Sequence, residues 1–319
     1  MECHSTNEVT IRTLGHFPPD IWGDSFSDFG VAENLRMQEY LEEIEPLKEE
    51  VRAMLIDESM DCDTKMRLID GVERLGLYYY FDDEIVRLLD QRFEETVARN
   101  FDLDGNLYDV ACQFRTFRQH GYKMPCAVFN KFTNGKGKFK ESLTNDERGM
   151  VSLYEAAHLR IKGEHILDEA LLFATDFLRS EKPSTEQARH ALKQASHLGI
   201  PRLESFHFIA FYEEDLSHDG TLLQLAKLEF NRMQLLYRQE LNQFQRWCKE
   251  REFARKLGHV RQRIVESHFW ALAMYYEPQY SFARVIVAKL ILVIPILDDT
   301  YDAYGTFEEL QLLTDAFDR

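Results

Sequence analysis

The spacing of apolar residues along the chain predicts long helices. In 221–247, apolar side chains recur at steps of three and four residues and define one face of a helix. The segment 35–55 repeats this pattern, and Pro46 inside it predicts a kink or a break between two helices. Asp219 and Thr221 flank a glycine and supply start signals for the helix at 221.

Shorter helices are predicted between these two segments. Residues 150–178 predict two helices that meet near Gly163, and 185–198 predict another that ends before Pro201. No sustained alternation of apolar and polar residues, which is typical of strands, occurs between turn residues. We therefore predict an all-α protein, with its most plausible domain boundary in the turn at 217–220.

Composition and charge exclude several classes of partner. The 319 residues carry 38 basic and 55 acidic side chains, a net charge of −17, which argues against nucleic acid and against an anionic membrane surface. The five cysteines are scattered and no CxxC occurs, which favours a reducing compartment. The N-terminus has no apolar core typical of a signal peptide. The longest apolar stretch, 285–297, is short for a membrane span and contains Lys289 and Pro295. We expect a soluble, cytoplasmic protein.

The strongest candidate for chemistry is an acidic cluster directly after that apolar stretch. Asp298 and Asp302 lie one turn apart on the same face of a predicted helix, and Asp299 lies about a quarter turn round. Three carboxylates so close together repel one another unless a cation lies between them. Hard oxygen ligands suit Mg²⁺, with Mn²⁺ as the alternative, and such an ion bridges to a phosphate. A solvated helix end would show the same pattern, and that alternative stays open.

Two further signals lie upstream of the acidic cluster. Arg261 and Arg263 could clamp an anion such as diphosphate, although an exposed basic turn is the simpler alternative. Aromatic residues crowd the segment 269–280, and Trp270 among them is the candidate for stabilising a cation on its ring face. Pro295, one turn before Asp298, predicts a kink in the helix that carries the acids.

With these residues in view, the chain resembles the plant terpene synthases, in particular the cytosolic sesquiterpene synthases. Arg12-Thr13 followed after eight residues by Trp22 looks like the family's N-terminal Arg-Arg-(x8)-Trp element, with Thr13 in place of the second arginine. Other segments similar to family segments, in the family's order, are FRTFRQHGY (114–122), VFNKF (128–132), LYEAAHLRIKGEHILDEA (153–170), IPRLES (200–205), LLQLAKLEFN (222–231), FWALAMYYEPQYSFAR (269–284) and LDDTYDAYGTFEEL (297–310).

The resemblance implies an N-terminal strap (1–30), a relict helical barrel domain (31–219) and the start of a class I terpenoid synthase domain (220–319). It further implies a lyase that ionises and cyclises farnesyl diphosphate, an allylic diphosphate, with Mg²⁺. The roles it implies are metal ligands at Asp298, Asp299 and Asp302, diphosphate binding at Arg261, Arg263, Asp298 and Asp302, a catalytic part for Arg261, Arg263 and Trp270, and an N-terminal cap of the site from Arg12 and Trp22.

The sequence departs from the family pattern at its C-terminal end. Family members continue past the acidic cluster to a second metal motif of the Asn/Ser/Glu type, and no such motif occurs in this sequence. An inactive truncated isoform or pseudogene product is therefore the alternative to an active synthase. Apolar helix faces left without partners would favour self-association. A chain-elongating prenyltransferase is disfavoured, because that family lacks the N-terminal barrel.

Overall fold

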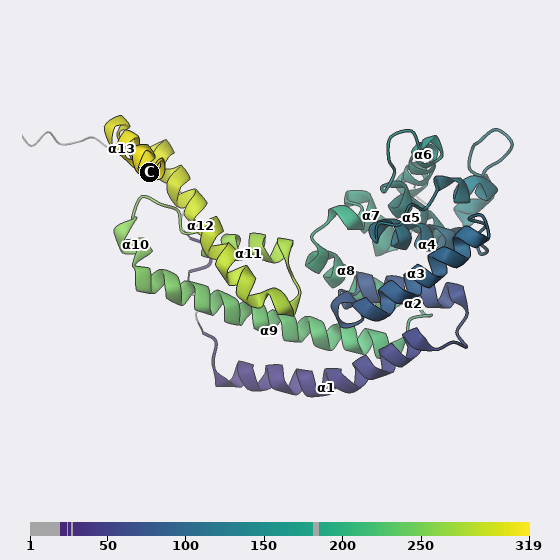
Figure 1. Ribbon diagram of the computed structural model, residues 1–319, viewed down its shortest axis with the longest axis horizontal. Coiled ribbons are helices and arrows are strands. Elements are labelled where there is room, and N and C mark those ends of the chain that lie inside the picture. The colour runs from purple at the N-terminus through teal and green to yellow at the C-terminus, as the bar shows by residue number, and fades with distance from the viewer. Residues whose placement is uncertain (1–19, 24, 27, 181–184) are drawn as a thin grey trace, which may run out of the picture. The chain divides into compact units, whose positions relative to one another are not determined.

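The computed structural model describes residues 20–23, 25–26, 28–180 and 185–319, and these residues are helical (Figure 1). The α-helices are α1 (Val31–Ile56), α2 (Cys62–Arg74), α3 (Asp82–Ala98), α4 (Leu107–Gln119), α5 (Glu147–Ala157), α6 (His165–Arg179), α7 (Glu186–Lys193), α8 (Pro201–Glu214), α9 (Gly220–Arg251), α10 (Phe253–Lys256), α11 (Ile264–Met274), α12 (Ser281–Ala303) and α13 (Phe307–Phe317). The 3-10 turns are η1 (Tyr78–Tyr80), η2 (Cys126–Phe132), η3 (Glu141–Asn145), η4 (Ser196–Leu198) and η5 (Pro278–Tyr280). The described residues hold no strand, only one isolated bridge between Thr133 and Phe139, so the all-α prediction is confirmed.

The chain divides into two compact units. The first comprises Gln38–Arg232, and the second combines Met1–Met37 with Met233–Arg319. We call them the 38–232 unit and the C-terminal unit. The sequence places the boundary in the turn before α9, whereas the structure divides the units inside α1 and inside α9. A turn is visible in the sequence, but a helix that begins in one core and ends in another carries no local signal.

The 38–232 unit is built around α4 and α5. These two helices are buried over almost their whole length, with Val110, Phe114 and Phe117 on α4 and Met150 and Leu153 on α5 removed from solvent. Helices α2, α6 and α7 pack around this pair and complete one continuous apolar core. Burial of large apolar side chains on this scale supplies most of the favourable free energy of folding.

Helix boundaries in this unit follow the predicted signals. Helices α5 and α6 are separated at Gly163, whose φ of +99° lies in the region that favours glycine. Pro201 occupies the first turn of α8, where its missing N–H has no intrahelical acceptor to lose. At the start of α9, Oδ1 of Asp219 accepts the backbone N–H of Leu222 at 2.8 Å. The breaks at Gly163 and at 217–220 are therefore confirmed. The helix predicted over 185–198 is shorter than expected, because α7 ends at Lys193 and the separate turn η4 precedes α8.

The prediction of a helix break at Pro46 is wrong, whereas a kink at Pro46 or at Pro295 stays a prediction. Helix α1 runs unbroken through Pro46, and α12 runs unbroken through Pro295. A proline removes one backbone hydrogen bond but does not end a helix that packing on both sides holds in place. In α1, Ile44, Val51 and Leu55 are fully buried on either side of Pro46. The acids at the end of α12 therefore lie on one continuous helix.

In the C-terminal unit, α9, α11 and α12 pack together. Figure 1 shows α11 and α12 as a hairpin joined by η5. Its small core contains Phe244 from α9, Ala271 from α11 and Ala288 and Leu292 from α12. Arg284 of α12 is fully buried, and its Nη1 donates to the carbonyl oxygens of Tyr275 and Glu277, which fixes the turn between the two helices.

Residues Pro278–Ala303 are long and apolar enough to cross a membrane on length and composition alone. The apolar stretch 285–297, which alone is short for a membrane span, is the central part of this longer segment. A core helix of a soluble protein passes the same test. We interpret α12 as a packed helix of the C-terminal unit, because its Arg284 is buried in an ion pair with Glu240 of α9 (Nη2 to Oε1, 2.6 Å).

Candidate functional site

The three predicted acidic ligands lie on the last turns of α12 but have different surroundings. Asp298 and Asp302 are exposed, and neither carboxylate makes a hydrogen bond or ion pair with any residue that the structure describes. Asp299 is 1% exposed and faces the interior of the unit. The helix therefore presents two carboxylates to solvent, one turn apart, and withdraws the third.

Asp299 is bound by Arg261. Its Oδ2 accepts the backbone N–H of Arg261 at 2.8 Å, and its Oδ1 accepts Nη2 at 2.9 Å and Nε at 3.2 Å. The guanidinium group and the carboxylate form an ion pair with more than one hydrogen bond, and the additional bond to the backbone N–H fixes the main chain at Arg261. No group of three or more acidic, histidine or cysteine side chains among the described residues is arranged to hold a metal. The prediction that all three acids share one ion therefore gains no support from the geometry, and their role as ligands stays a prediction.

Arg261 and Arg263 lie on the loop 257–263, which connects α10 to α11 and which we call the arginine loop. Arg263 is the N-cap residue of α11, and its carbonyl oxygen accepts the hydroxyl of Ser267 at 2.6 Å. Its guanidinium group makes no hydrogen bond or ion pair with the part of the chain that the structure describes. The two arginines thus differ, since one is held by a carboxylate and the other is available to a ligand.

The remaining predicted residues lie on or near α11. Trp270 lies on α11 with about half of its surface exposed, and its role as an aromatic wall residue stays a prediction. Trp22 donates from Nε1 to Oε1 of Glu266 in the first turn of α11, at 3.3 Å. The N-terminal segment therefore reaches the helix that follows the arginine loop. Arg12 lies outside the described residues.

Sequence reasoning missed a buried charge cluster in the same unit. Oε2 of Glu240 on α9 accepts Nε2 of His268 at 2.8 Å, and its Oε1 accepts Nη2 of Arg284 at 2.6 Å. Burial alone raises the pKa of Glu240, but the hydrogen bonds from His268 and Arg284 outweigh it and hold the pKa below its ordinary value. The sequence contains a sign of this cluster, because Glu240 lies on the apolar face of α9 between Leu236 and Phe244, where an acid is buried and needs a charged partner.

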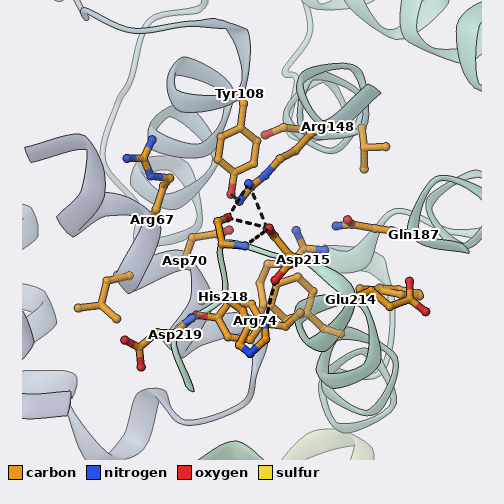
Figure 2. Close-up of a pocket in the computed structure, with 18 of the residues that line it drawn as sticks. Arg67, Asp70, Arg74, Tyr108, Arg148, Gln187, Glu214, Asp215, His218 and Asp219 are labelled. Atoms are coloured by element: carbon orange, nitrogen blue, oxygen red, sulfur yellow. Dashed lines mark hydrogen bonds and ion pairs between the residues drawn. The ribbon is translucent and has the colours of Figure 1, made fainter. Parts of the chain in front are cut away.

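A cavity of about 960 Å³ lies in the 38–232 unit, not at the acidic cluster. Figure 2 shows its charged walls, in which Arg148 reaches both Tyr108 and Asp215. Nη2 of Arg148 donates to the Tyr108 hydroxyl at 2.9 Å, and Nη1 lies 3.0 Å from Asp215. The pKa of Tyr108 is raised to about 12, and burial of the phenol contributes more to this rise than the nearby charges do. Arg67 is likewise paired, with Asp109 at 2.7 Å. The lining of the cavity holds six acidic side chains against three arginines, so the cavity suits a diphosphate less well than the region around the arginines of loop 257–263.

Family profiles match both parts of the chain. The profile of the terpene synthase N-terminal domain matches 21–198, and that of the terpene synthase family metal binding domain matches 249–319. The chain belongs to the terpene synthase family. The metal-binding match contains Arg261, Arg263, Trp270 and all three acids of α12, so this family's metal-binding region coincides with the site built above.

Curated relatives and solved structures agree with membership of the terpene synthase family. The chain is 47% identical to a hedycaryol synthase of Camellia brevistyla and to a valerianol synthase of Camellia sinensis, over 98% of this chain and 57% of each relative. It also resembles isoprene synthase from grey poplar leaves in complex with three Mg²⁺ ions and dimethylallyl-S-thiolodiphosphate, with a TM-score of 0.81, 38% identity, and coverage of 90% of this chain and 56% of that one. A limonene synthase with 2-fluorolinalyl diphosphate gives a TM-score of 0.86 at 29% identity, covering 96% and 58%. The chain thus spans a little over half the length of the relatives it matches.

Proposed function

We propose that this terpene synthase performs the metal-dependent ionisation of a prenyl diphosphate, with farnesyl diphosphate as the substrate. The observation that carries the proposal is the pair of carboxylates on α12, which have no partner among the described residues and lie within the matched metal-binding domain. Two carboxylates that are exposed one turn apart on the same helix face can hold a divalent ion that completes its shell with water and phosphate oxygens.

Asp298 and Asp302 fit a divalent ion of the Mg²⁺ type. Such an ion is usually held by one or two carboxylates, keeps several waters and completes its shell with phosphate oxygens. Two carboxylates one turn apart meet that requirement without Asp299, which Arg261 engages. A bound divalent ion would neutralise charge on the departing diphosphate. We propose Mg²⁺, with Mn²⁺ as the alternative, as the ion that these two residues hold.

The arginine loop would receive the diphosphate. Arg263 offers a guanidinium group that is not engaged by the described residues, and this group can donate two parallel hydrogen bonds to phosphate oxygens. Arg261 would contribute positive charge from a fixed position, because Asp299 holds its Nε and Nη2. Together these groups stabilise the negative charge that develops on the leaving group.

The hydrocarbon part of the substrate requires apolar and aromatic surface. Trp270 on α11 and the exposed residues Leu290 and Ile294 on α12 provide such surface in the same unit. An indole face stabilises a nearby carbocation through its quadrupole. The relatives named for hedycaryol and valerianol support a sesquiterpene product and hence a farnesyl substrate. Trp22, which donates a hydrogen bond to Glu266, would belong to the N-terminal cap of the site together with Arg12. We propose the cytoplasm as the location of the protein.

The test is turnover of farnesyl diphosphate by the purified chain. We expect Mg²⁺-dependent release of diphosphate and a sesquiterpene in the gas chromatogram, with geranyl diphosphate consumed more slowly. Asp298→Ala should lower the rate by about 100-fold or more, because it removes charge stabilisation at the leaving group. Asp318→Ala is the matched control, since Asp318 is an exposed acid of the same unit that follows α13. A helical, soluble sample that releases no diphosphate would contradict the proposal and favour the inactive alternative.

A further inference from the structure

The arginine loop is attached to α12 at a second point, through His259. The imidazole of His259 stacks on the ring of Tyr304, with centroids 3.8 Å apart and planes 9° from parallel. Its Nε2 lies 3.0 Å from the hydroxyl oxygen of Thr300. Both partners belong to the end of α12, since Thr300 is in its last turns and Tyr304 is its C-cap residue.

The direction of the hydrogen bond follows from the Thr300 hydroxyl. That hydroxyl has one proton, and it donates to the carbonyl oxygen of Ile296 at 2.6 Å, which can only accept. The Thr300 oxygen must therefore accept from His259, whose Nε2 carries the proton. The contact is specific to a ring with an N–H at this position, and a ring without one could keep only the stacking on Tyr304.

The two attachments hold adjacent residues of α12. Arg261 binds Asp299 through its backbone N–H and its guanidinium group, and His259 binds Thr300, the next residue of α12. Val260, between the two loop residues, is 9% exposed. A loop held at Asp299 alone could rotate about that contact, whereas a second contact on the adjacent helix residue removes this freedom.

We propose that His259 is a positioning residue for diphosphate binding, which fixes the spacing between Arg261 and Arg263 on the loop and Asp298 and Asp302 on the helix. The inference rests on the proposed function, because it concerns the same diphosphate. Its physical basis is preorganisation: a loop already ordered in the bound geometry does not have to be ordered when the ligand arrives. His259 itself touches no ligand in this account.

Isothermal titration calorimetry of the full chain tests the proposal, with inorganic diphosphate titrated in the presence of Mg²⁺ and, separately, with Mg²⁺ alone. We expect His259→Ala to weaken diphosphate binding by roughly tenfold, as loss of a supporting outer contact does at metal sites. Binding of Mg²⁺ alone should not change, because Asp298 and Asp302 both lie on α12. His259→Phe keeps the ring on Tyr304 and His259→Gln keeps a donor for Thr300, so each should restore part of the affinity.

The matched control is His165→Ala, because the side chain of His165 is 92% exposed and lies in the 38–232 unit. Thermal unfolding of the same variants separates positioning from stability. A purely structural role would lower the unfolding temperature of His259→Ala and leave the affinity of the folded molecules unchanged, which would overturn the inference. If the unaltered chain does not bind Mg²⁺ and diphosphate at all, the proposed function fails, and the positioning role fails with it. If the unaltered chain and His259→Ala bind diphosphate with the same affinity in the presence of Mg²⁺, the positioning role alone is overturned.

Discussion

Charged side chains serve different purposes inside the 38–232 unit and at the exposed end of α12. In the 38–232 unit, the buried charges of Arg115 and Asp70 and of Arg232 and Glu229 are paired within the fold, as are the partly buried Arg118 and Glu164. At the end of α12 in the C-terminal unit, Asp298 and Asp302 are exposed and have no partner among the described residues. The same chemical groups therefore hold the fold in one region and remain available to a ligand in the other.

Apolar side chains show the same contrast. The 38–232 unit gathers most of its large residues into one core, whereas α12 exposes Phe282, Leu290 and Ile294 and has only small clusters behind it. Exposed apolar surface of this kind marks binding sites or contacts with further protein. The helix with the smaller core behind it is therefore also the helix whose end carries acids without a partner among the described residues.

The largest effect should come from breaking a buried ion pair of the 38–232 unit. Arg115→Met leaves the Asp70 carboxylate, which is 4% exposed, buried without its cation. We expect the free energy of unfolding in urea to fall by about 3–5 kcal/mol. The double variant Arg115→Met/Asp70→Leu should recover much of the loss, because the Asp70 charge is no longer buried. A loss below about 1 kcal/mol in the single variant would break the comparison.

A smaller effect, on binding rather than folding, is expected at the arginine loop. Arg263→Met removes a guanidinium group that the described residues do not engage. Diphosphate affinity in the presence of Mg²⁺ should fall about tenfold, which corresponds to about 1.4 kcal/mol. The free energy of unfolding should stay the same. Arg251→Met, at the exposed end of α9, is the control and should change neither quantity. A stability loss in Arg263→Met would show that Arg263 serves the fold.

The pH dependence of stability should come from two histidines of the 38–232 unit. The rings of His158 and His197 lie 6.3 Å apart, and burial lowers the pKa of both below the ordinary 6.5, against an opposing effect of Glu155. The unfolded chain therefore takes up protons that the folded chain does not. Stability should be full above pH 6.5 and should fall as the pH drops towards the lowered values. Urea unfolding between pH 7.5 and 5.5 measures this, and His158→Asn/His197→Asn should flatten the profile. An equally steep profile in the double variant would assign it to other groups.

The smallest effect is expected at an exposed ion pair. Nζ of Lys138 lies 2.6 Å from Glu169, and the lysine side chain is 64% exposed. Lys138→Met should change the free energy of unfolding by no more than about 0.5 kcal/mol, because solvent screens the pair. A loss comparable with that of Arg115→Met would mean that burial does not explain the difference between ion pairs in this unit.

Much of the fold could be predicted from the sequence. Periodicity gives the α9 helix, and Gly163, Pro201 and Asp219 mark turns and caps, because each acts through its own backbone or side chain. The unbroken path of α1 through Pro46 could not be predicted, since it depends on packing by residues distant in the sequence.

The candidate site could be predicted less completely. The acidic cluster, the two arginines and Trp270 are visible as residue types in a recognisable order. Their pairing is not visible, because nothing in the sequence distinguishes Asp299 from Asp298 or joins it to Arg261. Helical geometry alone places Asp299 about a quarter turn from its neighbours, and only the position of the loop decides that this quarter turn is the buried one.

The most direct test compares one carboxylate from each region by the same change, Asp70→Asn and Asp298→Asn. For each variant we would measure the free energy of unfolding and the affinity for diphosphate with Mg²⁺. Asp70→Asn should lose about 2–3 kcal/mol of stability, because it weakens a charge-assisted bond to Arg115, with the affinity of the folded protein retained. Asp298→Asn should leave stability within about 0.5 kcal/mol and weaken diphosphate binding by roughly tenfold or more. A loss of stability in Asp298→Asn with unchanged affinity would contradict the division of roles between the two regions.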